Sequence, residues 1–500
     1  MIWLVLLLST LGLGTGLVGD ATGASWPELL EPSSPAPGLA PLESSAHGPR
    51  VEWDWAVVDR LADDQLEGFL VDLGVTRSLE GLVDYVRPRA RGMVCVGGRL
   101  HEPSGDPCGE FTLVRSPRSA LFIANLYDGQ IIEVAPTREG HHRRRKVRVE
   151  SFGTCAVEAL PAAPLRRSVP TPSAQGSPDA TPTIDVLMLY TRKVAREHSQ
   201  IAIELTAAAS IESAEAAYRN SEINLELRPV GLIEVAFDEE DGGTSDWLRF
   251  LKHPQGAICS DSSGDYECDP EGYMDEVLPM RDAFGADLVA LLVETGGAGI
   301  GYVLRNLDDP DGASGMSISK YSAAVGNQTF AHELGHNQGA THARGDGGGT
   351  GNGLYSYSWG HRWTGEWSGI PYSHRTIMAY SPGSRLRYFS NPNVNTVPWG
   401  DATGVPIGEE GEAHNAQTIT NVRSFVSGYR EHRKWVDFEG SGGEEDGSYE
   451  APFSTLAGGL EGVGRGEGVV MKGGETSETP LIDQSVLLDS YPGSSLIGGD

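Results

Sequence analysis

One stretch of the chain, TFAHELGHNQGATH at residues 329–342, constrains the fold more than any other. His332 and His336 are four residues apart, and four residues of α-helix turn through about 400°, so both imidazoles project from one face. Neutral imidazole nitrogens suit zinc, and two at this separation can reach one ion at about 2.0–2.1 Å. The spacing therefore predicts a helix that holds a metal ion.

Three further residues complete the predicted site. Glu333 points about 100° away from His332 around the helix, so it is better placed to hold a water on the metal than to bind the metal. Gly339 can adopt a positive φ without a Cβ penalty, which ends the helix and lets His342 fold back as a third ligand. Three protein ligands and one open position are typical of catalytic zinc, whereas structural zinc is fully enclosed.

A second motif lies downstream. A bare H-E-x-x-H also occurs by chance, as two exposed histidines on a polar helix, but H-E-x-x-H-x-x-G-x-x-H followed by a methionine turn is far more specific. The segment TIMAY at 376–380 supplies that methionine. Together the two motifs resemble the metzincin zinc endopeptidases. They are most similar to the reprolysin-like secreted enzymes, including bacterial relatives similar to peptidyl-Asp metallopeptidases.

The resemblance implies a fold and a mechanism for about half of the chain. The fold is an α/β (α+β) catalytic domain with a mixed, mostly parallel sheet, an active-site helix and a deep cleft. His332, His336 and His342 would bind one Zn²⁺. Glu333 would act as general base and then general acid in the hydrolysis of internal peptide bonds.

The same resemblance assigns roles around the methionine turn. Met378 would form an apolar floor beneath the histidines. Tyr380 matches a tyrosine that some metzincins swing onto or off the metal, with a packed turn residue as the alternative. The chain departs from the family at Ala343, because relatives often carry an acidic residue directly after the third histidine.

Composition and charge limit the partners and the compartment. A net charge of −31 argues against nucleic acid and anionic membranes as partners, because both would repel the chain. The apolar run from Ile2 to about Leu13, followed by small residues, reads as a signal peptide. No later stretch approaches 18 apolar residues. We therefore expect a secreted, soluble protein, and the resemblance implies that it acts on proteins or peptides.

The length of 500 residues predicts two or three domains. Pro/Ser/Ala-rich stretches separate the segments, and alternating apolar residues between them indicate a small β-rich pro-domain. The tail is rich in glycine and acidic residues, and its turn–helix–strand order resembles the opening coil of a parallel β-helix, either a remnant or a truncated one. The expected division is 1–24 signal peptide, 25–49 flexible leader, 50–159 pro-domain, 160–182 linker, 183–430 catalytic domain and 431–500 β-helix-like tail.

Within the catalytic domain the patterns predict individual elements. Buried strands are expected at 183–191, 225–237 and 286–294. One long helix is expected at 194–223. The segment 315–325 is expected to be the edge strand along which a peptide could lie.

The cysteines favour an oxidising compartment. Close spacing suggests two disulfides, Cys95–Cys108 and Cys259–Cys268, although five cysteines fix no connectivity. Cys155 is then left over, just before the linker. Its thiolate could fill the fourth zinc position and keep the precursor latent, as in some metzincins. Its flanking residues do not match the usual switch sequence, and it could instead pair with another cysteine.

Two acidic loops, 239–246 and 308–315, could hold Ca²⁺, with ordinary solvated loops as the alternative. The basic run 138–148 could pair with the acidic catalytic domain in the precursor. For the whole chain, one alternative is a metzincin-fold binding or adhesion protein without turnover. Another is a zinc hydrolase with a non-protein substrate. The endopeptidase is favoured because Glu333 and all three histidines are intact.

Overall fold

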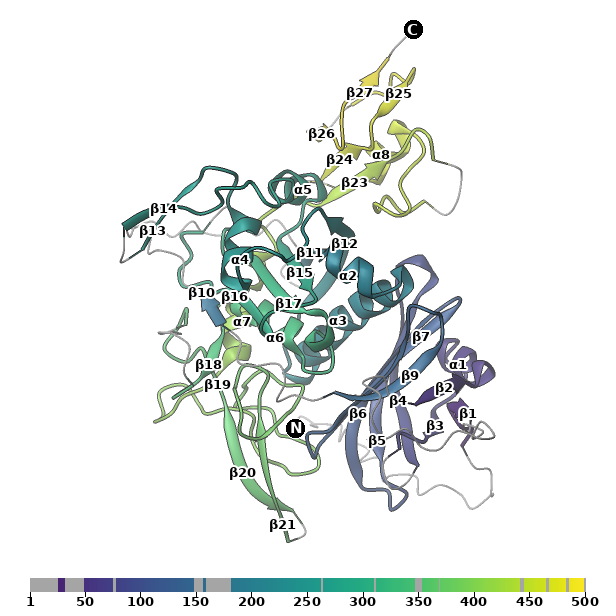
Figure 1. The fold of residues 1–500 in the computed structure, drawn as a ribbon, viewed down its shortest axis with the longest axis vertical. Helices are drawn as coiled ribbons and strands as arrows, with labels where there is room; N and C mark the ends of the chain where they lie inside the picture. Colours follow the sequence, from purple (N-terminus) through teal and green to yellow (C-terminus); the bar gives the residue numbers. More distant parts are fainter. Residues whose placement is uncertain are drawn as a thin grey trace, which may run out of the picture.

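The computed structural model describes residues 26–31, 49–74, 78–147, 156–158, 181–261, 264–309, 312–346, 353–367, 369–440, 445–464, 467–482 and 485–498. Figure 1 shows an N-terminal β-sheet in purple and blue, a central α/β domain in teal and green, and a small yellow C-terminal unit. None of the described helices has the length and apolar content needed to cross a bilayer. The expected signal peptide, residues 1–24, lies outside the described residues.

The N-terminal sheet has nine strands, and every neighbouring pair is antiparallel. Its two faces bury different cores, because successive side chains of a strand point to opposite sides. Phe122 packs with Phe111 under α1 (Trp55–Ala62), whereas Leu121 and Ile123 join the core of the central domain. In spatial order the strands are β1 (Leu30–Glu31), β2 (Arg50–Trp53), β9 (His142–Val147), β8 (Ile131–Pro136), β7 (Ser119–Leu126), β6 (Pro107–Ser116), β5 (Val94–His101), β4 (Leu79–Pro88) and β3 (Gly68–Val71).

The structure tests both expected disulfides. The Cys259–Cys268 bridge is confirmed and lies at the hairpin of β13 (Ile258–Asp261) and β14 (Gly264–Glu267). The Cys95–Cys108 pairing is wrong, and both cysteines are free. In the β5–β6 hairpin Cys95 lies opposite Val114, which is six residues, or about 20 Å, from Cys108. A disulfide needs the two Cα atoms within about 7 Å.

The central sheet has six strands, β10 (Ala156–Glu158), β16 (Gly299–Tyr302), β17 (Met316–Lys320), β15 (Leu288–Val293), β11 (Thr183–Thr191) and β12 (Glu226–Val235), in that order. Only the β16–β17 pair is antiparallel, so the expectation of a mixed, mostly parallel sheet is confirmed. The buried strands expected at 183–191, 225–237 and 286–294 correspond to β11, β12 and β15.

Helices cover both faces of this sheet (Figure 1). The even-numbered residues Val186 and Met188 of β11 pack with α3 (Gln200–Asn220), α6 (Thr329–Asn337) and α7 (Asn415–Val426). The odd-numbered Leu187 and Leu189 pack with α4 (Thr244–Lys252) and α5 (Val277–Phe284). A strand that is apolar on both faces must be covered on both, and this is the observed layering.

Two expected elements of the central domain are wrong. The single helix at 194–223 is broken into α2 (Arg192–Glu197) and α3, because Ser199 is extended and its hydroxyl caps the amide of Ala202. The segment 315–325 does not form the edge strand, since β17 lies between β16 and β15. On that side of the sheet, the outermost strand after the linker is β16, which pairs on its outer side with β10 and is a glycine-rich strand with little intrinsic strand propensity.

The remaining elements lie below and above the sheet in Figure 1. Below it are the β20–β21 hairpin (Arg362–Trp367 and Ile370–Arg375) with β22 (Ser384–Arg385), and the short pair β18 (Thr341–Ala343) and β19 (Trp359–Gly360). The C-terminal unit contains α8 (Leu456–Gly462) and parallel strands in two groups. These are β23 (Arg433–Val436), β24 (Gly468–Met471) and β26 (Leu487–Ser490), and β25 (Gly474–Thr476) with β27 (Ser495–Ile497).

Candidate metal centre

Helix α6 carries the first two histidines through the interior of the central domain. All of its nine residues are buried, so the helix forms by packing between the sheet and α3 rather than by its own propensity. Gln328, just before it, has a positive φ of 58°, and its carbonyl accepts from the amide of His332. The strained start and the complete burial fix the positions of His332 and His336.

Three histidine side chains converge at one point. The Nε2 atoms of His332 and His336 are 3.2 Å apart, those of His332 and His342 are 3.2 Å apart, and those of His336 and His342 are 3.0 Å apart. Three nitrogens bound tetrahedrally to one zinc ion at about 2.05 Å would be about 3.3 Å apart. The cluster therefore fits a metal ion of this size.

Backbone carbonyls fix the tautomers of two ligand candidates. Nδ1 of His332 donates to the carbonyl of Ile377 at 2.9 Å, and Nδ1 of His336 donates to the carbonyl of Ala340 at 2.9 Å. The proton is then on Nδ1, and the lone pair of each Nε2 points into the cluster. Burial lowers the pKa of His336 to about 4 and holds that of His332 well below its usual value, so both rings are neutral at pH 7.

The third histidine arrives through a glycine turn. Gly339 has a φ of +83°, and its amide donates to the carbonyl of His336. The amide of Ala340 donates to the carbonyl of Gly335 at 2.9 Å, which closes the end of the helix. Strand β18 then carries His342 back to the first two histidines, as the spacing predicted.

Two residues of the methionine turn contact the histidine cluster. Met378 is fully buried against α6, and a Cβ at Gly335 would lie only 2.7 Å from its sulfur. The ring of Tyr380 lies 4.1 Å from that of His342, centroid to centroid. Met378 therefore packs against α6, and Tyr380 flanks the histidine cluster.

Glu333 is fully buried, and its carboxylate lies against β16. A Cβ at Gly299 would lie 2.5 Å from Oε1 of Glu333, and a Cβ at Gly301 would lie 3.1 Å from Oε2. The glycines of β16 thus leave the space that the carboxylate occupies. Sequence reasoning missed this role, although two glycines at alternate positions of one segment were a visible signal.

Asp346 is a second residue that sequence reasoning missed. Its Oδ2 accepts from the amide of Ala343 at 3.2 Å and from the amide of Tyr380 at 2.9 Å, while Oδ1 accepts from Arg362. It therefore ties the segment after His342 to the methionine turn. The sequence did show an acidic residue close behind the third histidine, but the expectation of one concerned position 343 alone.

Other clusters have local explanations. His253 lies near Cys259 and Cys268, but these sulfurs form a disulfide and offer no thiolate. In the loops expected to suit Ca²⁺, the Glu239 carboxylate accepts from the amides of Glu294 and Thr295, and that of Asp309 caps the amide of Ala313. In the described part of the chain no acidic cluster suited to a cation occurs in either loop.

Comparison with known proteins supports the assignment of this site. Residues 180–390 match the family described as Metallo-peptidase family M12. A peptidyl-Asp metalloendopeptidase of Xanthomonas campestris pv. campestris is 26% identical over 351 residues, covering 67% of this chain and 73% of that protein. One from Stenotrophomonas maltophilia is 27% identical over 335 residues, covering 65% and 72%. These matches confirm the resemblance that the two motifs predicted.

A solved structure titled "Structure of a chaperone-substrate complex" covers 64% of this chain and 44% of its own, at 15% identity. Its TM-score of 0.35 is too low to bear on the fold.

The histidine cluster predicts the metal stoichiometry. We expect one zinc ion per purified chain, measured by elemental analysis. His336→Ala removes one of three converging nitrogens, so its zinc affinity should fall by more than about 100-fold, beyond the loss typical of an outer partner. His361→Ala, a histidine outside the cluster, is the matched control and should keep its zinc. Full zinc in the His336→Ala protein would rule out the cluster as the site.

The contacts of Asp346 predict an effect on ligand geometry. Asp346→Ala frees the segment after His342 and should weaken zinc binding by about 10–100-fold. It should also change the visible spectrum of the Co²⁺-substituted protein. Asp346→Asn keeps an acceptor for the two amides and should be closer to wild type. Asp401→Ala, which loses only the hydrogen bond from Tyr372, is the control. An unchanged Co²⁺ spectrum in Asp346→Ala would contradict the positioning role.

Proposed function

We propose that this chain, a zinc metalloendopeptidase whose residues 180–390 match the M12 metallopeptidases, is secreted as a latent precursor and cleaves internal bonds of proteins. The observation that carries the proposal is the convergence of three imidazole Nε2 atoms within 3.2 Å, beside a buried glutamate. Structural sites are closed by a fourth protein ligand, and His332, His336 and His342 are the only members of this cluster among the described residues.

His332, His336 and His342 would hold the zinc. When bound, zinc supplies Lewis-acid chemistry that makes water a nucleophile at neutral pH. The two Nδ1–H bonds to backbone carbonyls keep the ligand nitrogens aimed and unprotonated, so the histidines need no reorganisation to bind.

Glu333 would move the proton. Its carboxylate lies between α6 and the edge strand β16, next to the histidine that precedes it. In this role it accepts a proton from the attacking water and returns it to the leaving amine.

The substrate would lie along β16. An extended peptide adds readily to an exposed sheet edge through main-chain hydrogen bonds. Glu333 lies directly under this strand, so a peptide paired with β16 would bring its backbone to the base. Tyr380, whose ring packs on His342, would offer its hydroxyl to the oxyanion that forms on the peptide carbonyl.

The N-terminal sheet would serve as the inhibitory pro-domain. Strand β10, which ends just before the linker, pairs in parallel with β16, with Ala156 opposite Ile300 and Glu158 opposite Tyr302. It therefore takes the edge that a substrate would need. Cys155 lies outside the described residues, but it directly precedes β10 in sequence. We propose its thiolate as the fourth ligand in the latent precursor.

Loss of the general base gives the first test of the function. Glu333→Gln is nearly isosteric, so the protein should keep its zinc and lose about 10²–10⁴-fold in rate on a denatured protein substrate. Chelation should abolish the wild-type activity, and zinc should restore it. Mass spectrometry of the products would give the bonds cleaved and show whether they flank aspartate, the residue in the names of the relatives.

A Glu333→Gln protein with more than about a tenth of the wild-type rate would exclude this residue as the base. Undetectable cleavage by wild type after removal of the pro-domain, with zinc bound, would favour the binding or adhesion alternative. A zinc-dependent activity confined to non-protein substrates would favour the alternative of a zinc hydrolase that does not act on proteins.

The latency proposal has its own test. Cys155→Ser precursor should be active before the linker at 160–182 is cut, because the fourth ligand is gone, while wild-type precursor stays inactive. The measurement is hydrolysis by uncut protein, with the intact chain verified by mass. Cys108→Ser, a free thiol in the N-terminal sheet, is the matched control and should stay latent. Equal latency of Cys155→Ser and wild type would leave β10 and the bulk of the pro-domain as the block.

A further inference from the structure

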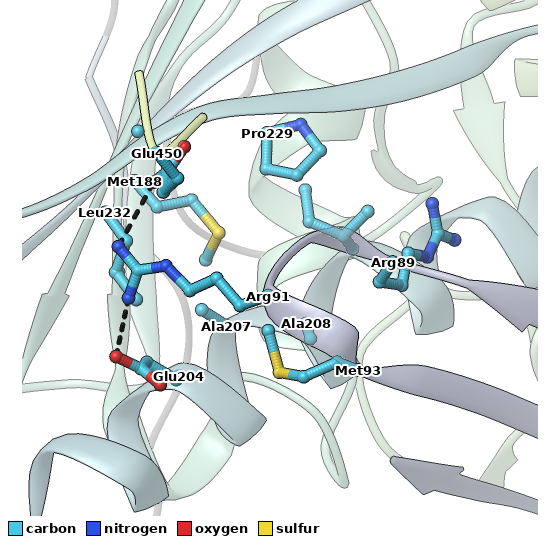
Figure 2. A pocket seen from close by; sticks show the side chains of 12 residues that line it. Arg89, Arg91, Met93, Met188, Glu204, Ala207, Ala208, Pro229, Leu232 and Glu450 are labelled. Atoms are coloured by element: carbon cyan, nitrogen blue, oxygen red, sulfur yellow. Dashed lines mark hydrogen bonds and ion pairs between the residues drawn. The ribbon is translucent and has the colours of Figure 1, made fainter. Parts of the chain in front are cut away.

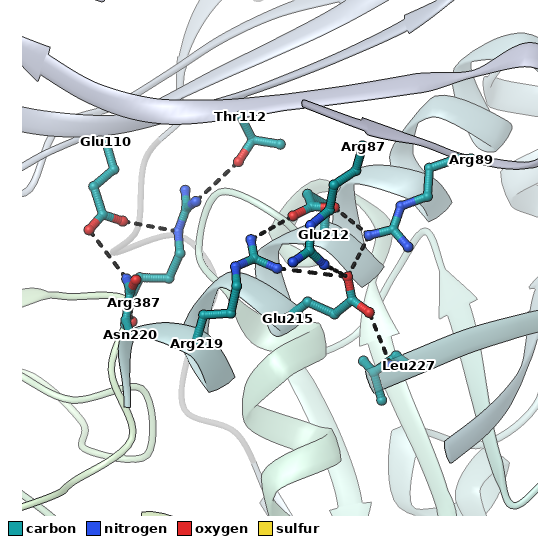
Figure 3. A network of polar contacts seen from close by, with 10 residues as sticks. All are labelled: Arg87, Arg89, Glu110, Thr112, Glu212, Glu215, Arg219, Asn220, Leu227 and Arg387. Atoms are coloured by element: carbon teal, nitrogen blue, oxygen red, sulfur yellow. Dashed lines mark hydrogen bonds and ion pairs between the residues drawn. The ribbon is translucent and has the colours of Figure 1, made fainter. Parts of the chain in front are cut away.

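Two glutamates on α3 face the N-terminal sheet from inside the central domain (Figure 3). Glu212 and Glu215 are both buried, with 0% and 3% of their surface exposed. One oxygen of each is used within the central domain. Oε1 of Glu212 accepts from Arg219 at 2.7 Å, and Oε1 of Glu215 accepts from the amide of Leu227 at 3.1 Å.

The other oxygen of each glutamate is used by the N-terminal sheet. Oε2 of Glu215 accepts from Arg87 at 3.1 Å, and Arg89 bridges Oε2 of Glu212 and Oε2 of Glu215 (Figure 3). Burial alone would raise the pKa of Glu212, but the charges of Arg89 and Arg219 outweigh it and the pKa is lowered. Each carboxylate is thus held by groups of its own domain, Arg219 among them, and also pairs with arginine from the N-terminal sheet.

The arginines come from one short run, RPRARG at 87–92. Arg87 is the last residue but one of β4, and Arg89 follows that strand. Arg91 reaches further along α3 to Glu204 at 2.6 Å and to Glu450 of the C-terminal unit at 3.3 Å (Figure 2). Alternate guanidinium groups therefore meet successive carboxylates along one side of the helix.

At the other end of α3 the charges are reversed. Arg387 of the central domain, only 3% exposed, reaches into the N-terminal sheet, where it pairs with Glu110 at 3.3 Å and donates to Thr112 at 3.1 Å and Asn125 at 3.1 Å. Both domains thus contribute arginines to the same interface, and Arg87, Arg89 and Arg387 each have a glutamate partner on the opposite domain.

Apolar packing between the domains is less complete. A cavity of about 70 Å³ remains beside Arg91, lined by Met93 of the N-terminal sheet and by Met188, Ala207 and Leu232 of the central domain (Figure 2). An apolar void forgoes the dispersion contacts that close packing would supply.

We propose that the Glu212–Glu215 face of α3 is a docking site for the paired arginines Arg87 and Arg89, which holds the N-terminal sheet on the central domain after the linker is cut. Removal of the sheet leaves two carboxylates three residues apart, with only Arg219 and one amide to offset them. The cut sheet therefore stays bound and can rebind. This inference concerns binding alone and does not depend on the proposed hydrolysis.

The test uses the full chain with Glu333→Gln and a recognition sequence for a site-specific protease inserted in the 160–182 linker. After the cut, the two fragments should co-elute in size-exclusion chromatography at physiological ionic strength. Strand β10 stays with the N-terminal fragment and also binds the central domain, so the decisive comparison is between variants.

Arg87→Ala with Arg89→Ala should speed dissociation of the cut fragments by about thirtyfold or more, the usual cost of truncating a buried charged partner. Arg99→Ala is the matched control, because Arg99 pairs with Asp84 inside the sheet and both are exposed. The cut fragments of the Arg99→Ala protein should dissociate at the wild-type rate. The uncut variants should elute at the same volume as uncut wild type and should have its circular dichroism spectrum.

Glu212→Gln with Glu215→Gln tests the same site without changing the N-terminal sheet, and it provides the readout if the arginine variant does not fold. It should speed dissociation to a similar extent. Immediate separation of the wild-type fragments, or dissociation at the wild-type rate in folded Glu212→Gln/Glu215→Gln protein, would overturn the proposal.

Discussion

The hydrogen bond from Nδ1 of His332 to the carbonyl of Ile377 links the two motifs of the chain, 45 residues apart in sequence. It turns the imidazole so that Nε2 faces the other two histidines, and it ties the active helix to the methionine turn. The bond from His336 to Ala340 does the same for the turn that returns His342. Without these bonds, burial of the three histidines would only cost free energy, because polar groups would leave water without gaining hydrogen bonds in the core.

The spacing of the motif was enough to predict the cluster, because every relation in it is local. The four-residue step between His332 and His336 sets one helix face, and Gly339 sets the reversal. The buried strand at 183–191 was equally readable, since an apolar run bounded by turn residues leaves few alternatives. Local periodicity thus predicted three of the sheet strands, the helix that carries His332 and His336, and the convergence of the three histidines.

Contacts between segments that are distant in the chain could not be predicted from the sequence. Nothing in the order of residues showed that the glycines of β16 make room for Glu333, or that Asp346 reaches Tyr380. The Cys95–Cys108 pairing failed for a related reason, because short separation says nothing of register in a hairpin. The break at Ser199 was missed because the apolar pattern runs through it, and one capping hydroxyl outweighed that pattern.

The contact between Met378 and Gly335 has a consequence for the chemical durability of the site. The sulfur lies where a Cβ at position 335 would be only 2.7 Å away, so the space around it is full. Conversion of the thioether to a sulfoxide adds an oxygen and a dipole to this apolar contact. The added oxygen would push on the helix between His332 and His336. An oxidant that reached this one sulfur would therefore disturb the arrangement of the three histidines without reacting with any of them.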